Sequence, residues 1–123
     1  KNNIKTYNGF LDKGISVGEN TKALIIANEF INNRSAITAK DQSDIYVSSN
    51  KYGRNKINIE MYQKKQIFKH PSVYNIDENH ENQKIKKTKK SHYFKTEDDI
   101  ELNNLSLATV FKNLKNKNWT EYE

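Results

Sequence analysis

Three histidines are the residues best suited to acid–base chemistry in this chain: His70, His80 and His92. Imidazole titrates near neutral pH, so one histidine could take the 2′-hydroxyl proton of RNA while another protonates the leaving oxygen. His92 is the first choice, because lysines precede it and Tyr93 follows it, and His70 is the second. Arg54 and Tyr93 complete the predicted catalytic set, since an arginine can stabilise the charge that develops on phosphorus. The alternative is that all three are ordinary surface histidines.

A run of lysines between positions 84 and 90 is the strongest electrostatic feature of the sequence. Ammonium groups neutralise phosphates without reading base sequence, and tyrosines beside them could stack on unpaired bases. The predicted nucleic-acid-binding residues are Lys84, Lys86, Lys87, Lys89, Lys90, Tyr52 and Tyr62. Equally, the lysine run could be a solvated loop, and the tyrosines could simply cover a sheet.

The composition excludes some kinds of functional site and favours some kinds of partner. The 123 residues include no cysteine, which excludes disulfides, thiolate zinc sites and a thiol nucleophile. The wide spacing of the histidines matches no compact ligand motif, so we expect no metal and no cofactor. A net charge of +6 favours RNA or another polyanion, or an acidic inhibitor protein, as the partner.

The elements that position these residues are predicted to form an α+β fold. From about Thr21 to Asn32, apolar residues recur at three- and four-residue spacing, which predicts an N-terminal amphipathic helix. Ser106 can cap a C-terminal helix whose apolar face includes Val110 and Leu114. Trp119 is expected to fold back as an anchor.

The clearest period of the sequence lies between Asp44 and Lys69. Ile57, Ile59 and Met61 alternate with polar residues, which predicts a half-buried strand. Strands are expected at about 44–48, 56–62 and 66–69, and their short connections predict hairpins. The sheet under the N-terminal helix is therefore predicted to be small and antiparallel.

Length favours a single domain spanning 1–123, and the start at Lys1 suggests a piece excised from a larger protein. Residues 72–91 are acidic and then basic, without apolar periodicity, which predicts a long polar loop. We find no internal repeat by inspection. No stretch approaches the roughly 18 apolar residues of a membrane span. The location stays open, with secretion or delivery into a target cell among the options.

These features favour a small basic RNA-acting domain, with a metal-independent ribonuclease of the effector or toxin kind as the leading hypothesis. Two alternatives stay open. A non-enzymatic extracytoplasmic domain is one, because a helix followed by strands over Thr21 to Lys69 resembles the soluble head of pilin-like subunits in architecture. The other is a non-catalytic module that binds nucleic acid or an acidic protein.

Overall fold

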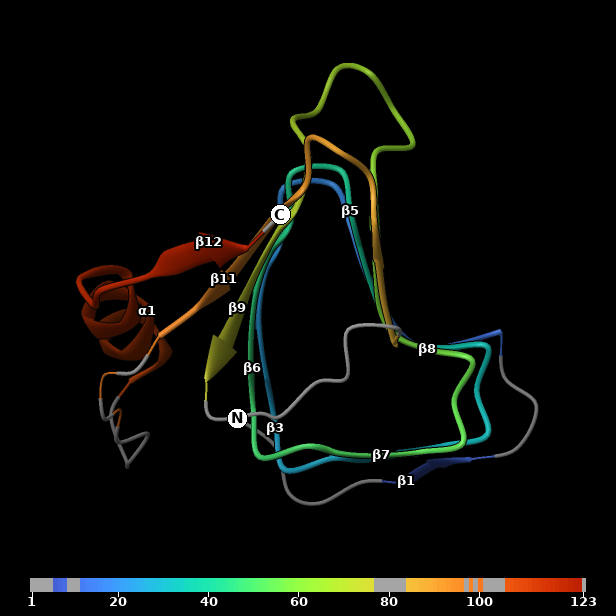
Figure 1. The fold of residues 1–123 in the computed structure, drawn as a ribbon. Helices are drawn as coiled ribbons and strands as arrows, with labels where there is room; N and C mark the ends of the chain where they lie inside the picture. The colour runs from blue at the N-terminus through green and yellow to red at the C-terminus, as the bar shows by residue number, and fades with distance from the viewer. Residues whose placement is uncertain are drawn as a thin grey trace.

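The computed structural model describes residues 6–8, 12–76, 84–96, 98, 100 and 106–122. Over these residues the chain winds into a β-solenoid, in which strands of successive coils pair in parallel and form three walls (Figure 1). Sheet A contains, in spatial order, β1 (Thr6–Asn8), β4 (Glu29–Ile31) and β7 (Lys51–Gly53). Sheet B contains β10 (Ile85–Lys87), β8 (Ile57–Tyr62), β5 (Ser35–Lys40) and β2 (Lys13–Val17). Sheet C contains β12 (Thr120–Tyr122), β11 (His92–Lys95), β9 (Ser72–Ile76), β6 (Asp44–Ser48) and β3 (Lys22–Ile26).

A 22-residue spacing relates the central coils. In sheet C, Lys22 stands opposite Asp44, and in sheet B, Ile37 stands opposite Ile59. The turns repeat as well, because residues with positive φ occur in pairs at this spacing. The pairs are Glu19 and Asp41, Asn20 and Gln42, Ala27 and Ser49, and Asn32 and Arg54. The chain therefore does contain an internal repeat, and the prediction that it has none is wrong.

Asparagines hold the corners of neighbouring coils together. The Asn55 side chain accepts a hydrogen bond from the Asn33 backbone N–H at 2.9 Å and donates one to the Phe30 carbonyl at 2.9 Å. Asn50 repeats this arrangement, since its side chain accepts from the Asn28 backbone N–H at 2.9 Å. Backbone groups at a buried corner need such partners, because an unpaired buried donor is costly.

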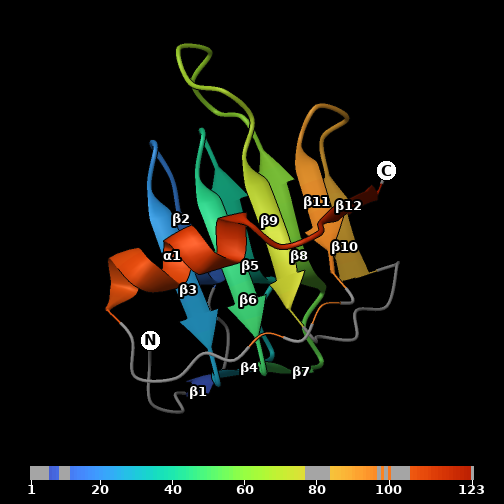
Figure 2. The ribbon, with the colours of Figure 1, turned by 90° about the vertical axis from the view of Figure 1, so that its left-hand side faces the viewer.

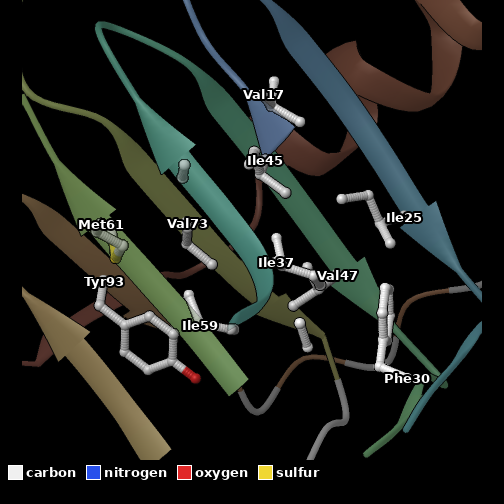
Figure 3. Close-up of a cluster of buried hydrophobic side chains, with 12 residues drawn as sticks. Val17, Ile25, Phe30, Ile37, Ile45, Val47, Ile59, Met61, Val73 and Tyr93 are labelled. Atoms are coloured by element: carbon white, nitrogen blue, oxygen red, sulfur yellow. The ribbon is translucent and has the colours of Figure 1, made fainter. Parts of the chain in front are cut away.

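The coil interior is filled by aliphatic side chains that stack in register (Figure 3). Ile15, Ile37, Ile59 and Ile85 form one such ladder across sheet B. This ladder faces residues of sheet C, among them Ile45, Val47 and Val73. Three of the isoleucines are fully buried, namely Ile37, Ile45 and Ile59. The strand predicted at about 56–62 is present as β8, and Ile59 and Met61 belong to the core of the coil. It is not half-buried as predicted, because Asn58 and Glu60 on its other face are buried as well.

The outer face of sheet C carries a second apolar cluster. Tyr46 and Tyr74 stack with ring centroids 4.5 Å apart, and Phe94 continues the stack at 4.8 Å from Tyr74. Helix α1 (Leu107–Lys115) lies across this face (Figure 2) and buries Val110 and Leu114 against it.

The predicted C-terminal helix is thus present. Ser106 is its N-cap, as predicted, and the Ser106 hydroxyl accepts a hydrogen bond from the Thr109 backbone N–H at 3.3 Å. Trp119 packs against the tyrosine stack and donates to the Leu114 carbonyl at 2.8 Å, in agreement with the expected C-terminal anchor.

The N-terminal helix predicted from Thr21 to Asn32 is wrong. This segment forms β3 and β4, with the left-handed residue Ala27 between them. Ile25 points into the coil while Leu24 points outward under α1, so both faces of β3 are apolar. A strand buried on both faces gives a continuous apolar run, which three- and four-residue spacing does not distinguish from a helix.

The predicted α+β class and its small antiparallel sheet are also wrong, because the described residues form mostly parallel sheets with one short helix. Strands do lie at 44–48 and 57–62, but their partners are strands of the neighbouring coils and run parallel to them. Residues 66–69 form no strand, and the connection between β6 and β8 contains β7. The long polar loop predicted for 72–91 contains β9 and β10, while residues 77–83 lie outside the described part of the chain.

Candidate functional site

The turns that lead from sheet B to sheet C stack at one edge of the solenoid, which we call the B–C corner (top of Figure 1). It consists of residues 18–21, 41–43, 63–71 and 88–91. Backbone hydrogen bonds join successive turns, from Asn20 N–H to the Asp41 carbonyl at 2.8 Å and from His92 N–H to the Pro71 carbonyl at 3.0 Å. The corner is therefore a continuous surface built from segments far apart in sequence.

The longest turn, residues 63–71, projects beyond the others (Figure 2) and is tied down at its base. The Asp41 carboxylate accepts hydrogen bonds from the backbone N–H groups of Lys64 and Lys65 at 2.7 and 2.9 Å. Burial raises the pKa of Asp41, but these two N–H groups and the nearby lysine charges outweigh it and lower that pKa overall. Asp41 is thus an ionised anchor for the loop.

Lysines dominate the exposed surface of the B–C corner. The exposed members are Lys64, Lys65, Lys69, Lys89 and Lys90. Lys65 forms an ion pair with Glu19. Among the described residues, the other four ammonium groups have no ion-pair partner. On two adjacent turns the corner therefore presents four positive charges that have no ion-pair partner in the described part of the chain.

His70 belongs to the B–C corner, and His92 lies directly beside it as the first residue of β11, where its backbone N–H donates to the Pro71 carbonyl. His70 Nδ1 lies 3.3 Å from the Thr88 hydroxyl. Burial lowers the pKa of His70, and the charges of Lys90 and His92 lower it further. His70 is consequently held towards its neutral form, in which one ring nitrogen can accept a proton.

His92 has a different environment, although it stands on the next coil. Its Nδ1 lies 2.6 Å from Glu121 Oε2, and its ring stacks on Phe94 with centroids 6.1 Å apart. A carboxylate at Nδ1 orients the imidazole and leaves Nε2 as the nitrogen that can exchange a proton. The two histidines therefore differ in a way that suits different proton-transfer roles.

Two residues of the predicted catalytic set lie elsewhere. Tyr93 is 3% exposed, points into the coil, and accepts a hydrogen bond from the Asn75 side chain at 2.9 Å. Arg54 lies in the turn before β8, whereas the B–C corner follows β8, so the length of this strand separates Arg54 from the histidines. The structure does not bring the four predicted residues together.

The predicted lysine run is divided between the two ends of β10. Lys89 and Lys90 belong to the corner, and Lys87 lies beside it, with Nζ 3.1 Å from the Ser91 carbonyl. Lys84 Nζ donates to the Asn55 carbonyl at 2.9 Å, at the opposite end of the strand. Lys86 is exposed on β10, between these two ends.

The tyrosines predicted to stack on bases have partners within the fold. The Tyr52 ring stacks on Phe30, with centroids 5.6 Å apart, and packs against the core. Tyr62 accepts a hydrogen bond from Lys13 Nζ at 3.3 Å. His80 lies outside the described residues. Lys64 and Lys69 were not in the predicted set, although the basic sequence of 64–69 is a signal that could have identified them.

Comparisons with protein-family models, with curated proteins and with solved structures find no match to this chain. Over the described residues, no group of three or more histidine and acidic side chains is arranged to hold a metal ion. None of the described helical structure is long and apolar enough to cross a membrane.

Proposed function

We propose that the B–C corner binds RNA through lysine contacts to its phosphates, without reading its sequence. The observation that carries this proposal is a set of exposed lysines on stacked turns, none of which has an ion-pair partner within the described segments: Lys64, Lys69, Lys89 and Lys90. Neighbouring coils of a parallel sheet lie about 4.8 Å apart, so one short strand of RNA can meet cations from both turns. The main contribution to affinity is the release of counterions from the phosphates.

Paired substitutions of equal charge test the location of the site. Lys64→Gln/Lys69→Gln and Lys89→Gln/Lys90→Gln each remove two charges from the corner, whereas Lys51→Gln/Lys56→Gln removes two exposed charges outside it. Fluorescence anisotropy with a labelled single-stranded RNA, at several salt concentrations, measures affinity and its salt slope. Each corner variant should reduce the slope by about 1.4 and weaken binding about tenfold at low salt. Equal losses in all three variants would place RNA binding outside the corner.

An anionic membrane is the competing polyanion. Ile67 is 85% exposed at the projecting loop, among lysines, and an apolar side chain there could enter a lipid interface. Sedimentation with vesicles containing phosphatidylglycerol, with and without Ile67→Ser, separates the two partners. RNA binding should be unchanged by Ile67→Ser. Vesicle binding that depends on Ile67, without RNA binding, would refute the proposal.

Ribonuclease activity is a second candidate, favoured by the adjacency of His70 and His92 beside Lys90. In this reaction neutral His70 takes the 2′-hydroxyl proton, and the 2′-oxygen attacks the adjacent phosphorus. The bond to the 5′-oxygen breaks, and protonated His92, oriented by Glu121, gives that oxygen its proton. The products are a 2′,3′-cyclic phosphate and a 5′-hydroxyl end, and no metal is needed.

Incubation of purified protein with RNA in EDTA tests this activity. His70→Ala and His92→Ala should each abolish cleavage, because each removes one of the two proton-transfer groups. The same variants should retain RNA binding in the anisotropy assay, since the lysines remain. Absence of cleavage by the wild-type protein, or cleavage that survives both changes, contradicts the ribonuclease and leaves the binding proposal intact.

A further inference from the structure

A hollow of about 480 Å³ lies between α1 and the outer face of sheet C. This volume is within the range of about 300–1,000 Å³ that is usual for small-molecule sites. Its walls come from three strands and the helix, and the lining residues are Lys22, Asp44, Tyr46, Tyr74, Ala108, Phe111, Lys112 and Lys115. The helix covers only part of the outer face of the sheet (Figure 2), and the hollow lies where the helix and the sheet do not fill the space between them.

Tyr46 and Tyr74 line the hollow, and their rings are in contact with other aromatic rings. Tyr46 and Tyr74 stack on each other, and Trp119 meets both rings edge-on, at centroid distances of 6.1 and 5.0 Å. Burial raises the pKa values of both tyrosines and the nearby Asp44 charge adds to this, although a hydrogen bond with Ser72 acts in the opposite direction at Tyr74. Their hydroxyl groups consequently stay protonated and can donate hydrogen bonds.

Charge is unequal around the hollow. Lys22, Lys112 and Lys115 contribute three positive charges, and Asp44 contributes one negative charge. Burial raises the pKa of Asp44, although Lys22 and Lys115 act in the opposite direction. Among the described residues, none of these lysines forms a direct ion pair with Asp44. The lining therefore carries an excess of two positive charges.

We propose that this hollow binds a small phosphate monoester with a hydroxyl-bearing body, such as a sugar phosphate. A phosphate monoester carries a charge of about −1.5 to −2 at pH 7, which matches the excess on the lining. The lysines bind the phosphate oxygens as point charges, and the Tyr74 hydroxyl donates to one of them. Asp44 accepts a hydrogen bond from a ligand hydroxyl, while Phe111 and Ala108 contact the apolar part of the body. This site is separate from the B–C corner and does not depend on RNA binding there.

Isothermal titration with ribose 5-phosphate tests the proposal, with ribose and inorganic phosphate as matched probes. Ribose 5-phosphate should bind at least about tenfold more tightly than either fragment, because only the ester uses both the lysines and Asp44. Stronger or equal binding of inorganic phosphate would overturn the assignment, and so would the absence of binding by ribose 5-phosphate.

Variants locate the bound ester. Lys22→Gln/Lys112→Gln should weaken ribose 5-phosphate about tenfold or more, whereas the charge-matched Lys51→Gln/Lys56→Gln should not. Asp44→Asn should reduce the preference for ribose 5-phosphate over inorganic phosphate, and Tyr74→Phe should weaken both while the ring stack remains. The corner variant Lys64→Gln/Lys69→Gln should leave this binding unchanged, even if RNA binding is lost or never occurs. Equal weakening by Lys51→Gln/Lys56→Gln would refute the site.

Discussion

The two faces of sheet C are made by the same strands, yet they are closed in different ways. On the inner face, Ile45, Val47 and Val73 pack against the other walls of the coil. On the outer face, Tyr46 and Tyr74 form a stack that is closed by α1 and Trp119. The inner face is covered by the repeat itself, whereas the outer face is covered by a segment that occurs once.

This difference suggests that the inner face mainly stabilises the fold, whereas the outer face offers a place for a ligand. Within the coil, interior positions of neighbouring coils stand opposite one another and their side chains are fully buried, as in the ladder that includes Ile37 and Ile59. A single helix laid across a sheet has no such complement along its whole length, and it leaves a hollow lined by charged residues. We therefore expect interior substitutions to act on the whole fold and outer-face substitutions to act locally.

The largest expected effect comes from truncating the interior ladder. Ile37→Ala should lower the free energy of unfolding by about 2–5 kcal/mol, because Ile37 is fully buried between two coils. Val110→Ala, on the buried face of α1, should cost clearly less, since the helix can shift. Urea denaturation of both variants measures the difference. Equal losses would contradict the distinction between the two faces.

A smaller effect is expected at the corners of the repeat. Asn55→Ala should cost about 1–3 kcal/mol, because it leaves the buried Asn33 N–H and the Phe30 carbonyl without their side-chain partner. Asn50→Ala is the matched control, since Asn50 makes the same contacts at a less buried corner. Its loss should be smaller in the same urea experiment. A larger loss of stability for Asn50→Ala would show that burial does not determine how much these asparagine hydrogen bonds stabilise the fold.

The smallest effect is a pH dependence at the B–C corner, where the chain passes from sheet B to sheet C. The pKa of His70 is lower in the folded chain, so the unfolded chain binds the proton more readily. Stability from this group is fully present above about pH 6.5, the unfolded value, and is lost as pH falls through the folded pKa. His70→Gln should therefore reduce the loss of stability between pH 7.5 and 5.5, relative to wild type, in urea titrations. Lys90→Gln should reduce it in part, and an unchanged pH dependence in both variants would contradict this account.

Some features of this protein were predictable from local sequence. The alternation of Ile57, Ile59 and Met61 predicts a strand, and Ser106 before an apolar stripe predicts a capped helix, because both signals depend on neighbouring residues. The proximity of His92 to lysines is likewise a property of the chain itself. Net charge also follows from composition, and it restricts the kind of partner without placing a site.

Only the tertiary structure decided which strands pair, because hydrogen bonds of a parallel sheet join residues a whole coil apart. The local sequence does not predict the corners, because the left-handed backbone positions there are occupied by Ala27, Ser49 and Arg54, whereas glycine is the usual residue at such positions. The sequence of β3 resembles an amphipathic helix because the strand is buried on both faces, by the coil interior on one side and by α1 on the other. The stacking of the coils also determines that His70 lies beside His92 and that Tyr93 is buried in the interior. It places the turn that contains Lys64 and Lys69 next to the turn that contains Lys89 and Lys90.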